Sequence, residues 1–253
     1  MTLGIMQPYF MPYLGYFQAI AAVDKYILYG NLTFIKDGWM NRNRVLLKNG
    51  QVQMISVPLL HKSSDTMIYD IQIDNSKPWQ KKFLKTLFLN YKSAPFFEEI
   101  YPFIENLLSS QYVTLEELNV CSIRSIASYL DITTEIESNS YKYEKVEQTL
   151  DIWETNPQTL SYLVTKPERK VARVIEICRQ EGCHDFINAI GGQILYDKKE
   201  FAIYDIDLKF VHTNSISYQQ NGNEFVPNLS IIDVLMFNGK EGTQELLNEY
   251  TLV

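Results

Sequence analysis

The chain has 253 residues, 46 % of them hydrophobic, with 23 Lys and Arg against 30 Asp and Glu and a formal net charge of −7. This composition is typical of a globular protein and excludes a disordered or collagen-like chain. No segment approaches the roughly 18 apolar residues of a membrane helix, and no basic signal-peptide segment opens the chain. Three widely spaced cysteines, Cys121, Cys178 and Cys183, indicate reduced thiols. We therefore expect a cytoplasmic protein with no membrane insertion.

The charge is unevenly distributed along the chain. Residues 1–92 carry 11 Lys and Arg against 5 Asp and Glu, a net +6, whereas residues 93–253 carry 12 against 25, a net −13. A basic region of this kind favours an anionic partner. A small molecule such as a nucleotide-sugar suits the sequence better than a long nucleic acid, because no basic tract or RNA-binding motif is present. Alternatively, the two oppositely charged parts only attract each other.

The first 30 residues predict a βαβ unit. Residues 3–7 have the apolar pattern of a buried strand, the prolines at 8 and 12 force an irregular turn, and residues 15–23 have near-helical apolar spacing. Residues 26–29 form the second strand. Parallel pairing is the default for two strands joined in this way.

A β-hairpin is expected next. Residues 45–48 and 51–57 are strand-like and flank Asn49-Gly50, a pair typical of a type I′ turn. The segment before them, residues 31–43, is rich in Asn and Gly and predicts a loop.

Helices predominate in the middle of the chain. Helices are expected over residues 79–91, 96–108, 114–130, 169–180 and 231–237, and one further strand over residues 206–211. Thr114 and Glu117 have the spacing of a capping box. Residues 138–165 are polar and predict an irregular, mobile excursion.

These elements predict an α/β fold that combines a βαβ-type opening, a small mostly parallel sheet, a β-hairpin and a helical insertion. We expect an α/β core built from residues 1–75 and 184–253, with a mainly helical region over residues 76–183. One continuous domain is the alternative.

Common catalytic and metal-binding motifs are missing from the sequence. It contains no glycine-rich phosphate loop, no zinc-protease motif and no nucleophile elbow. Cys178, Cys183 and His184 lack a fourth ligand at a recognisable spacing, so packing of Cys178 in a helix face is favoured over a metal site. We expect no metal, and the sequence points to no particular cofactor.

Large polar and aromatic residues are concentrated on the loops of the basic region. They are Gln7, Tyr9, Tyr13, Tyr16, Lys36, Trp39, Asn41, Arg42, Asn43 and Arg44. Loops at the carboxyl ends of parallel strands bind ligands in open α/β sheets. The three cations suit a diphosphate, and the aromatic rings suit stacking on a base or a sugar. The alternative is a tyrosine-rich surface with structural asparagines and a solvated arginine pair.

Three further residues are candidates for proton transfer or binding. His61 lies on a loop and is a possible general base, although a solvated histidine is the alternative. Asp197 follows the Gly191-Gly192 turn. Asp233 lies in the first turn of an expected helix, where an acidic residue often only complements the helix dipole.

The spacing of Tyr13-Leu-Gly-Tyr16 matches the His-x-Gly-His signature of nucleotidylyltransferases, which also follows a first strand and opens a helix. Both histidines are tyrosines here. Tyrosine does not supply the same imidazolium contact to phosphate, so the similarity stays at the level of the fold.

Several segments resemble the WbqC-like protein family. The most specific are Met-Gln-Pro-Tyr-Phe-Met-Pro-Tyr-Leu-Gly-Tyr-Phe-Gln at residues 6–18 and Trp-Met-Asn-Arg-Asn-Arg at residues 39–44. Residues 90–97, 191–197 and 229–239 extend the resemblance, in order, over nearly the whole chain. The sequence departs from the family at Gly30-Asn31, where many members have an acidic pair, and at Ser217-Tyr-Gln-Gln220.

The resemblance implies a role in bacterial surface-polysaccharide (O-antigen-type) biosynthesis. It suggests a glycyl or other acyl transferase that acts on a nucleotide-linked amino sugar. The residues that match the family's pattern are Gln7, Tyr9, Tyr13, Tyr16, Trp39, Asn41, Arg42, Asn43, Arg44, Tyr91, Asp197 and Asp233.

Residue types suggest roles within that reaction. Arg42 or Arg44 would hold the diphosphate, and the amide of Asn41 or Asn43 would stabilise the acyl oxyanion. His61 or Asp197 would accept the proton. A non-catalytic binding or scaffold protein of a polysaccharide assembly system is the first alternative, and a degenerate nucleotidylyltransferase-like enzyme is the second. A homodimer is expected only from the general frequency of dimers.

Overall fold

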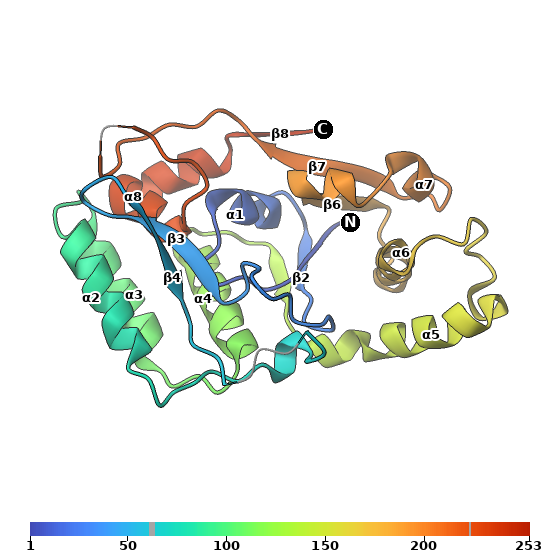
Figure 1. Ribbon diagram of the computed structural model, residues 1–253. Coiled ribbons are helices and arrows are strands. Elements are labelled where there is room, and N and C mark those ends of the chain that lie inside the picture. The colour runs from blue at the N-terminus through green and yellow to red at the C-terminus, as the bar shows by residue number, and fades with distance from the viewer. Residues whose placement is uncertain (61–63, 223) are drawn as a thin grey trace.

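A six-stranded sheet forms the centre of the molecule (Figure 1). The computed structural model describes residues 1–60, 64–222 and 224–253. The strands of the sheet, in spatial order, are β5 (Glu135–Glu137), β2 (Lys25–Leu28), β1 (Thr2–Met6), β6 (Asp185–Ala189), β7 (Asp207–Thr213) and β8 (Tyr250–Leu252). All neighbours pair in parallel except β7 and β8. The expected mostly parallel sheet is therefore confirmed.

The order of the parallel strands is that of a doubly wound fold. Numbered along the chain, the five parallel strands lie in the order 3-2-1-4-5. The chain adds strands on one side of β1 and then returns to add β6 and β7 on its other side. The order thus reverses between β1 and β6, the position at which such sheets open a crevice at their carboxyl edge.

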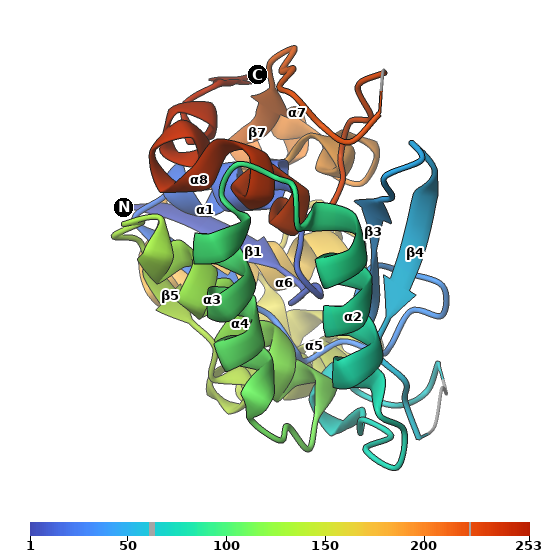
Figure 2. The same cartoon turned by 90° about the vertical axis from the view of Figure 1, so that its left-hand side faces the viewer.

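Helices cover both faces of the sheet. On one face lie α1 (Leu14–Ala21), α2 (Trp79–Tyr91), α3 (Phe97–Ser109), α4 (Leu115–Tyr129) and α8 (Ile231–Leu247), and on the other lie α5 (Glu144–Thr155), α6 (Arg169–Glu181) and α7 (Lys198–Ala202). Figure 2 shows the first layer from outside. Alternate strand residues supply the two cores, since Tyr26 and Leu28 pack in one and Ile27 in the other.

Most of the expected helices are confirmed, with ends shifted by a residue or two. Helix α2 has the predicted bounds, and Thr114 and Glu117 form the predicted capping box at the start of α4. Helix α8 runs ten residues beyond the expected end at 237, with a kink at Gly239. Gly239 has φ 62°, and a Cβ there would lie 2.5 Å from the Phe96 ring, so glycine is needed at the kink.

The expectation of an irregular segment over residues 138–165 is wrong. The segment contains the short 3-10 helices η2 (Ser140–Tyr143) and η3 (Pro157–Leu160) on either side of α5. Val146, Leu150 and Trp153 are buried along one face of α5 and pack beside α6. Their helical spacing is present in the sequence, but frequent polar residues between them obscure it. Two other 3-10 helices are η1 (Ile68–Asp70) and η4 (Ile190–Ile194).

The expected hairpin is present, formed by β3 (Arg42–Leu46) and β4 (Val52–Ser56). Its first strand begins three residues earlier than expected, so the placement of Arg42, Asn43 and Arg44 on a loop is wrong and all three pair with β4. Its turn is not type I′, because only Gly50 of the Asn49-Gly50 pair has positive φ. The Gly50 amide donates to the Leu47 carbonyl (N···O 2.9 Å). The five residues between the strands therefore make a longer turn that ends on a left-handed glycine.

Strands β5, β6 and β8 were not expected. Strand β5 comes from the region over residues 76–183, so that region contributes an edge strand to the central sheet. The proposed division of the chain into two regions stays a prediction. Among the residues that the structure describes, no helix combines the length and apolar character needed to cross a membrane.

Gly4 provides a test of the packing at the centre of the sheet. A Cβ at this position would lie 2.5 Å from Cδ2 of the buried Tyr26, whereas a Cβ at Gly191 meets nothing within 4 Å. We predict that Gly4→Ala lowers the free energy of unfolding by about 1–3 kcal/mol through overpacking. Gly191→Ala, the matched control, should change it by less than about 0.5 kcal/mol. Urea denaturation measures both, and equal effects would contradict this packing.

Candidate functional site

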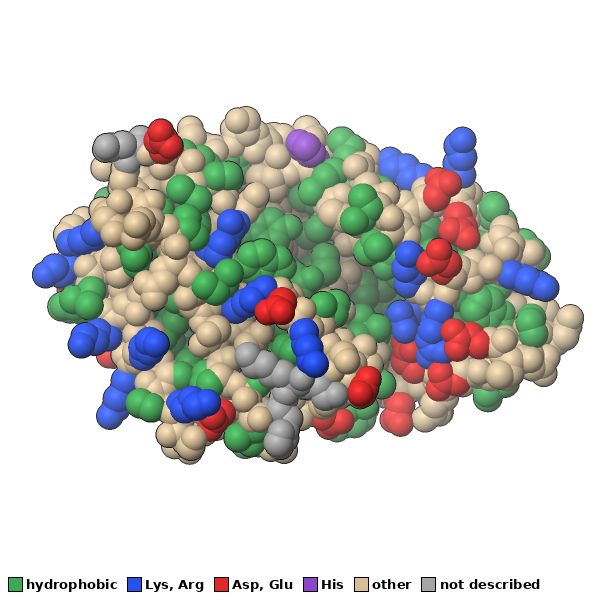
Figure 3. Space-filling view, in the orientation of Figure 1, with side chains coloured by type: hydrophobic (Ala, Val, Ile, Leu, Met, Phe, Trp, Pro, Cys, Tyr) green, Lys and Arg blue, Asp and Glu red, His purple; other side chains and the backbone are tan. Residues whose placement is uncertain are grey.

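A cavity of about 780 Å³ opens at the carboxyl edge of the parallel sheet. Its walls include Met6 and Gln7 at the end of β1, Tyr29 after β2, Asn188 on β6 and Thr213 on β7. The cavity therefore lies where the strand order reverses, the usual ligand position in a doubly wound sheet. In the space-filling view, the middle of this face is hollowed and its floor is largely apolar (Figure 3).

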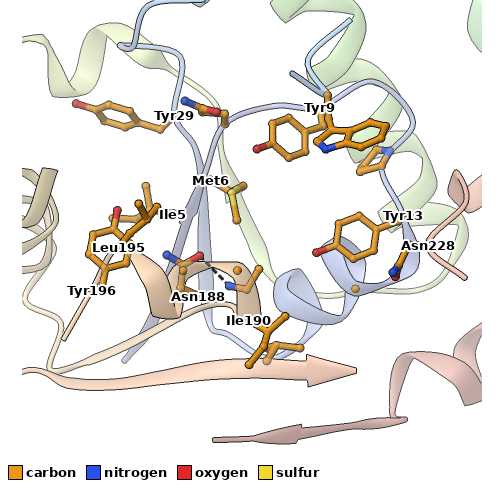
Figure 4. Close-up of a pocket in the computed structure, with 18 of the residues that line it drawn as sticks. Ile5, Met6, Tyr9, Tyr13, Tyr29, Asn188, Ile190, Leu195, Tyr196 and Asn228 are labelled. Atoms are coloured by element: carbon orange, nitrogen blue, oxygen red, sulfur yellow. Dashed lines mark hydrogen bonds between the residues drawn. The ribbon is translucent and has the colours of Figure 1, made fainter. Parts of the chain in front are cut away.

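Six of the predicted site residues line the cavity. They are Gln7, Tyr9, Tyr13, Trp39, Asn43 and Arg44. In Figure 4 the Tyr9 and Tyr13 hydroxyls point into the space beside Met6, opposite Tyr29 and Tyr196. Burial raises the pKa of both Tyr9 and Tyr13. The two phenols are therefore neutral and present hydrogen-bond donors to the cavity.

Helix α1 begins at the cavity wall. Its N-cap residue, Tyr13, and Gly15 both line the cavity. A Cβ at Gly15 would lie 2.5 Å from the Tyr13 ring and 2.9 Å from Oγ1 of Thr213, so glycine allows this close approach. The amino end of a helix favours negative charge, and no acidic residue occupies the first turn of α1.

Arg44 has the clearest anion-binding geometry in the wall. Its guanidinium carbon lies 5.4 Å from the centre of the Trp39 ring, and Nη2 donates to the Asn228 carbonyl at 3.0 Å. The buried Nε of Arg44 has no hydrogen-bond partner among the described residues. A guanidinium with unused donors suits a phosphate or a carboxylate.

The described cavity wall has basic but no acidic side chains. Arg44 and Arg173 are its two arginines, His212 is its histidine, and none of the described residues that line it is Asp or Glu. The charge and the aromatic walls together suit an anionic ligand that also has a flat or apolar part.

The asparagines proposed as oxyanion donors hold the backbone instead. Asn41 is buried and its Nδ2 donates to the Val57 carbonyl at 3.0 Å. Asn43 Nδ2 donates to the carbonyls of Phe10 (3.0 Å) and Met11 (2.6 Å). The Asn43 bonds fix the loop between β1 and α1, which forms one wall of the cavity, whereas the Asn41 bond joins the segment before β3 to the residue after β4.

Tyr16, Arg42, Lys36 and Asp197 lie outside the cavity wall. Tyr16 is buried and its hydroxyl donates to the Gln7 carbonyl at 2.8 Å, so it supports the wall from behind. Arg42 bonds to the Gly38 carbonyl and pairs with Asp37. Lys36 and Asp197 are exposed, and Asp197 caps α7. The proposed base His61 lies outside the described residues.

Tyr91 and Asp233 form a buried network away from the cavity. The Asp233 carboxylate accepts hydrogen bonds from the Tyr91 hydroxyl (2.8 Å), the Tyr218 hydroxyl (2.9 Å) and Gln220 Nε2 (2.8 Å). Tyr91 also accepts the Leu46 amide of β3 at 3.0 Å. The network thus ties α8 to α2 and to the hairpin, which indicates a structural role.

Sequence reasoning missed seven residues with polar side chains in the cavity wall. They are Tyr29, Arg173, Asn188, Tyr196, His212, Thr213 and Asn228. Asn188 lies near the end of the unexpected strand β6, and His212 lies one residue beyond the strand expected over 206–211. Recognising β6 as a parallel strand would have drawn attention to its carboxyl end. In the described part of the chain, no three His, Cys, Asp or Glu residues gather as a metal site would require.

The Asp233 network makes a testable contribution to stability. Burial raises the pKa of the Asp233 carboxyl, and the three hydrogen bonds offset part of that rise. Because the pKa is higher in the folded state than in the unfolded state, the stabilisation is greatest at low pH and decreases as the pH rises through the folded-state pKa. Asp233→Asn cannot titrate, and in either orientation of the new amide its NH2 group faces at least one of the groups that donate to Asp233.

We predict that Asp233→Asn lowers the free energy of unfolding by about 1–3 kcal/mol, because it leaves buried donors unpaired. The loss should be larger near pH 4, about the unfolded-state pKa of an aspartate, than at about pH 8. Urea denaturation at the two pH values checks this, with Tyr218→Phe as a milder variant that removes one donor to Asp233 and one acceptor of Gln220 Nε2. A loss that grows with pH would contradict the assigned direction of the pKa shift.

Comparison with known proteins agrees with the resemblance seen in the sequence. The model of the WbqC-like protein family matches residues 7–245. A Mycobacterium tuberculosis protein, "Uncharacterized protein Rv1507c", is 28 % identical over 246 residues, which cover 96 % of this chain and 96 % of that protein. No solved structure gives a significant match. Since the family match covers nearly the whole sequence, the chain belongs to the WbqC-like protein family.

Proposed function

We propose that the cavity binds a nucleotide-linked amino sugar and that the protein transfers an acyl group, such as glycyl, to the amine of that sugar. The observation that carries the proposal is the cavity wall itself, which combines three basic side chains with aromatic rings and has no acidic residue among those described. Membership in the WbqC-like protein family supports it, given the polysaccharide role that the resemblance implies.

Arg44 is the residue proposed to hold the diphosphate. It has free guanidinium donors, lies at the wall from which α1 starts, and is stacked on Trp39. Arg42 is not proposed to hold the diphosphate, because its guanidinium is already bonded to Asp37 and Gly38. The aromatic rings of Tyr9 and Trp39 would contact the base or the sugar.

Acyl transfer needs a base and a group that stabilises the acyl oxygen. The amine nitrogen forms a bond to the acyl carbon, the bond from that carbon to its leaving group breaks, and the nitrogen gives up a proton. His212 is the proposed proton acceptor, because imidazole is a common general base and this one lines the cavity. Asn188 is the proposed oxyanion donor, since its Oδ1 accepts the Ala189 amide at 2.7 Å and its NH2 group makes no hydrogen bond to another described residue.

Nucleotidyl transfer is a second candidate. It is favoured by the strand order and by Tyr13 and Gly15, which lie at the cavity wall in the position where nucleotidylyltransferases have the His-x-Gly-His signature. That reaction would release pyrophosphate from a nucleoside triphosphate, whereas acyl transfer to an amino sugar would leave the diphosphate intact.

We predict that Arg44→Ala weakens binding of UDP- and dTDP-linked sugars by about 2 kcal/mol, or roughly thirtyfold in Kd, because charge-assisted hydrogen bonds are lost. Arg44→Lys should recover only part of the affinity, since it keeps the charge but loses the planar fork. Arg179→Ala, an exposed change on α6, is the control. Calorimetric titration measures all four proteins. Equal affinities for wild type and Arg44→Ala would show that Arg44 does not bind the ligand.

The reaction itself is tested by mass spectrometry of an amino-sugar nucleotide incubated with candidate acyl donors. A product heavier by one acyl group, lost in His212→Ala and Asn188→Ala, is the expected result. Pyrophosphate release from a nucleoside triphosphate would favour nucleotidyl transfer instead. Binding of the nucleotide-sugar without any covalent change across the panel of donors would favour a binding or scaffold protein.

A further inference from the structure

We infer that Glu147, a residue outside the cavity wall, limits the number of anionic groups that the cavity binds by neutralising Arg173. Glu147 is thus a specificity-determining residue that leaves Arg44 as the one arginine of the described wall without a carboxylate partner. The inference deepens the proposed function and rests on it for the nature of the ligand.

Glu147 holds Arg173 by two hydrogen bonds. Nε of Arg173 donates to Oε1, and Nη2 donates to Oε2 at 2.9 Å. The Tyr29 hydroxyl also donates to Oε1, at 2.6 Å. The side chains of Glu147 and Arg173 are only 14 % and 15 % exposed, so solvent screens this pair weakly. The guanidinium is therefore oriented and electrically compensated before any ligand arrives.

Arg169 also pairs with Glu147, but it has other carboxylate partners and, among the described residues, Arg173 does not. Arg169 shares Oε2 of Glu147 at 2.9 Å but also pairs with Asp151 and Glu154, each at 2.8 Å. Loss of the Glu147 charge would therefore leave Arg169 with two carboxylates and Arg173 with none. Arg173 is the member of this cluster that lines the cavity, so the released charge would appear there.

The two ends of the cavity consequently differ in charge. Arg44 and Trp39 lie on the side of the hairpin, and Arg173 comes from α6 on the other side of the sheet centre (Figure 1). Ile5, Leu195 and Tyr196 accompany Arg173, which makes that end apolar and nearly neutral. The arrangement favours a ligand with one cluster of phosphates, placed at Arg44, and an uncharged part directed towards Tyr29 and Tyr196.

The experiment measures binding of inorganic pyrophosphate by calorimetry to the full chain. We expect Glu147→Gln to bind pyrophosphate about tenfold more tightly than wild type, because Arg173 gains free charge-assisted donors. The double variant Glu147→Gln with Arg173→Ala should lose this gain. Asp151→Asn removes one negative charge from the same helix without contacting Arg173 and should leave the affinity unchanged. A gain in affinity cannot come from damage to the fold.

Each outcome decides the inference. Unchanged or weaker binding in Glu147→Gln, or a gain that persists in the double variant or appears in Asp151→Asn, would overturn it. If Glu147→Gln binds pyrophosphate and wild type does not, the result supports the role of Glu147 and contradicts the assignment of Arg44 as an anion site. If neither protein binds it, both the inference and the proposed phosphate site are wrong.

Discussion

The position of β1 between β2 and β6 is the constraint on which the rest of the structure depends. Because the chain builds the sheet outwards from β1 first to one side and then to the other, the connections after β1 and β6 leave the sheet on different faces. The crevice between them becomes the cavity. Residues near the carboxyl ends of four parallel strands then meet in one place, although the sequence separates them by up to about two hundred positions.

One wall of this cavity, the loop between β1 and α1, is fixed by buried hydrogen bonds rather than by regular structure. The loop between β1 and α1 is held by the amides of Asn43 and Asn119, and Oγ of Ser230 donates to the Met11 carbonyl at 2.8 Å. Such bonds satisfy backbone groups that an irregular buried loop would otherwise leave unpaired. A rigid wall keeps Tyr9, Tyr13 and Arg44 in position, which reduces the ordering cost of binding.

Much of the fold could be predicted from the sequence, and less of the site. The opening βαβ unit, the hairpin and the helices follow from apolar periodicity, which is a local property. Strand β6 has polar residues at Asp185 and Asn188 among only three apolar ones and ends near Gly191-Gly192, so its pattern is weak and Asn188 could not be placed. Asn41, Asn43 and Asp233 have residue types that suit chemistry or structure equally well. Only tertiary contacts show that Asn41 and Asp233 are buried and bonded away from the cavity. Arg173 was expected on a helix, but which neighbour that helix faces depends on packing across the sheet.

The central claim is that the crevice between β1 and β6 is a phosphate-containing ligand site. A crystal structure of the protein with a bound nucleoside diphosphate tests it most directly. The account predicts phosphate density within hydrogen-bond distance of the Arg44 guanidinium, beside Tyr9 and the start of α1. Phosphate density at another surface, with the crevice empty, would contradict the account.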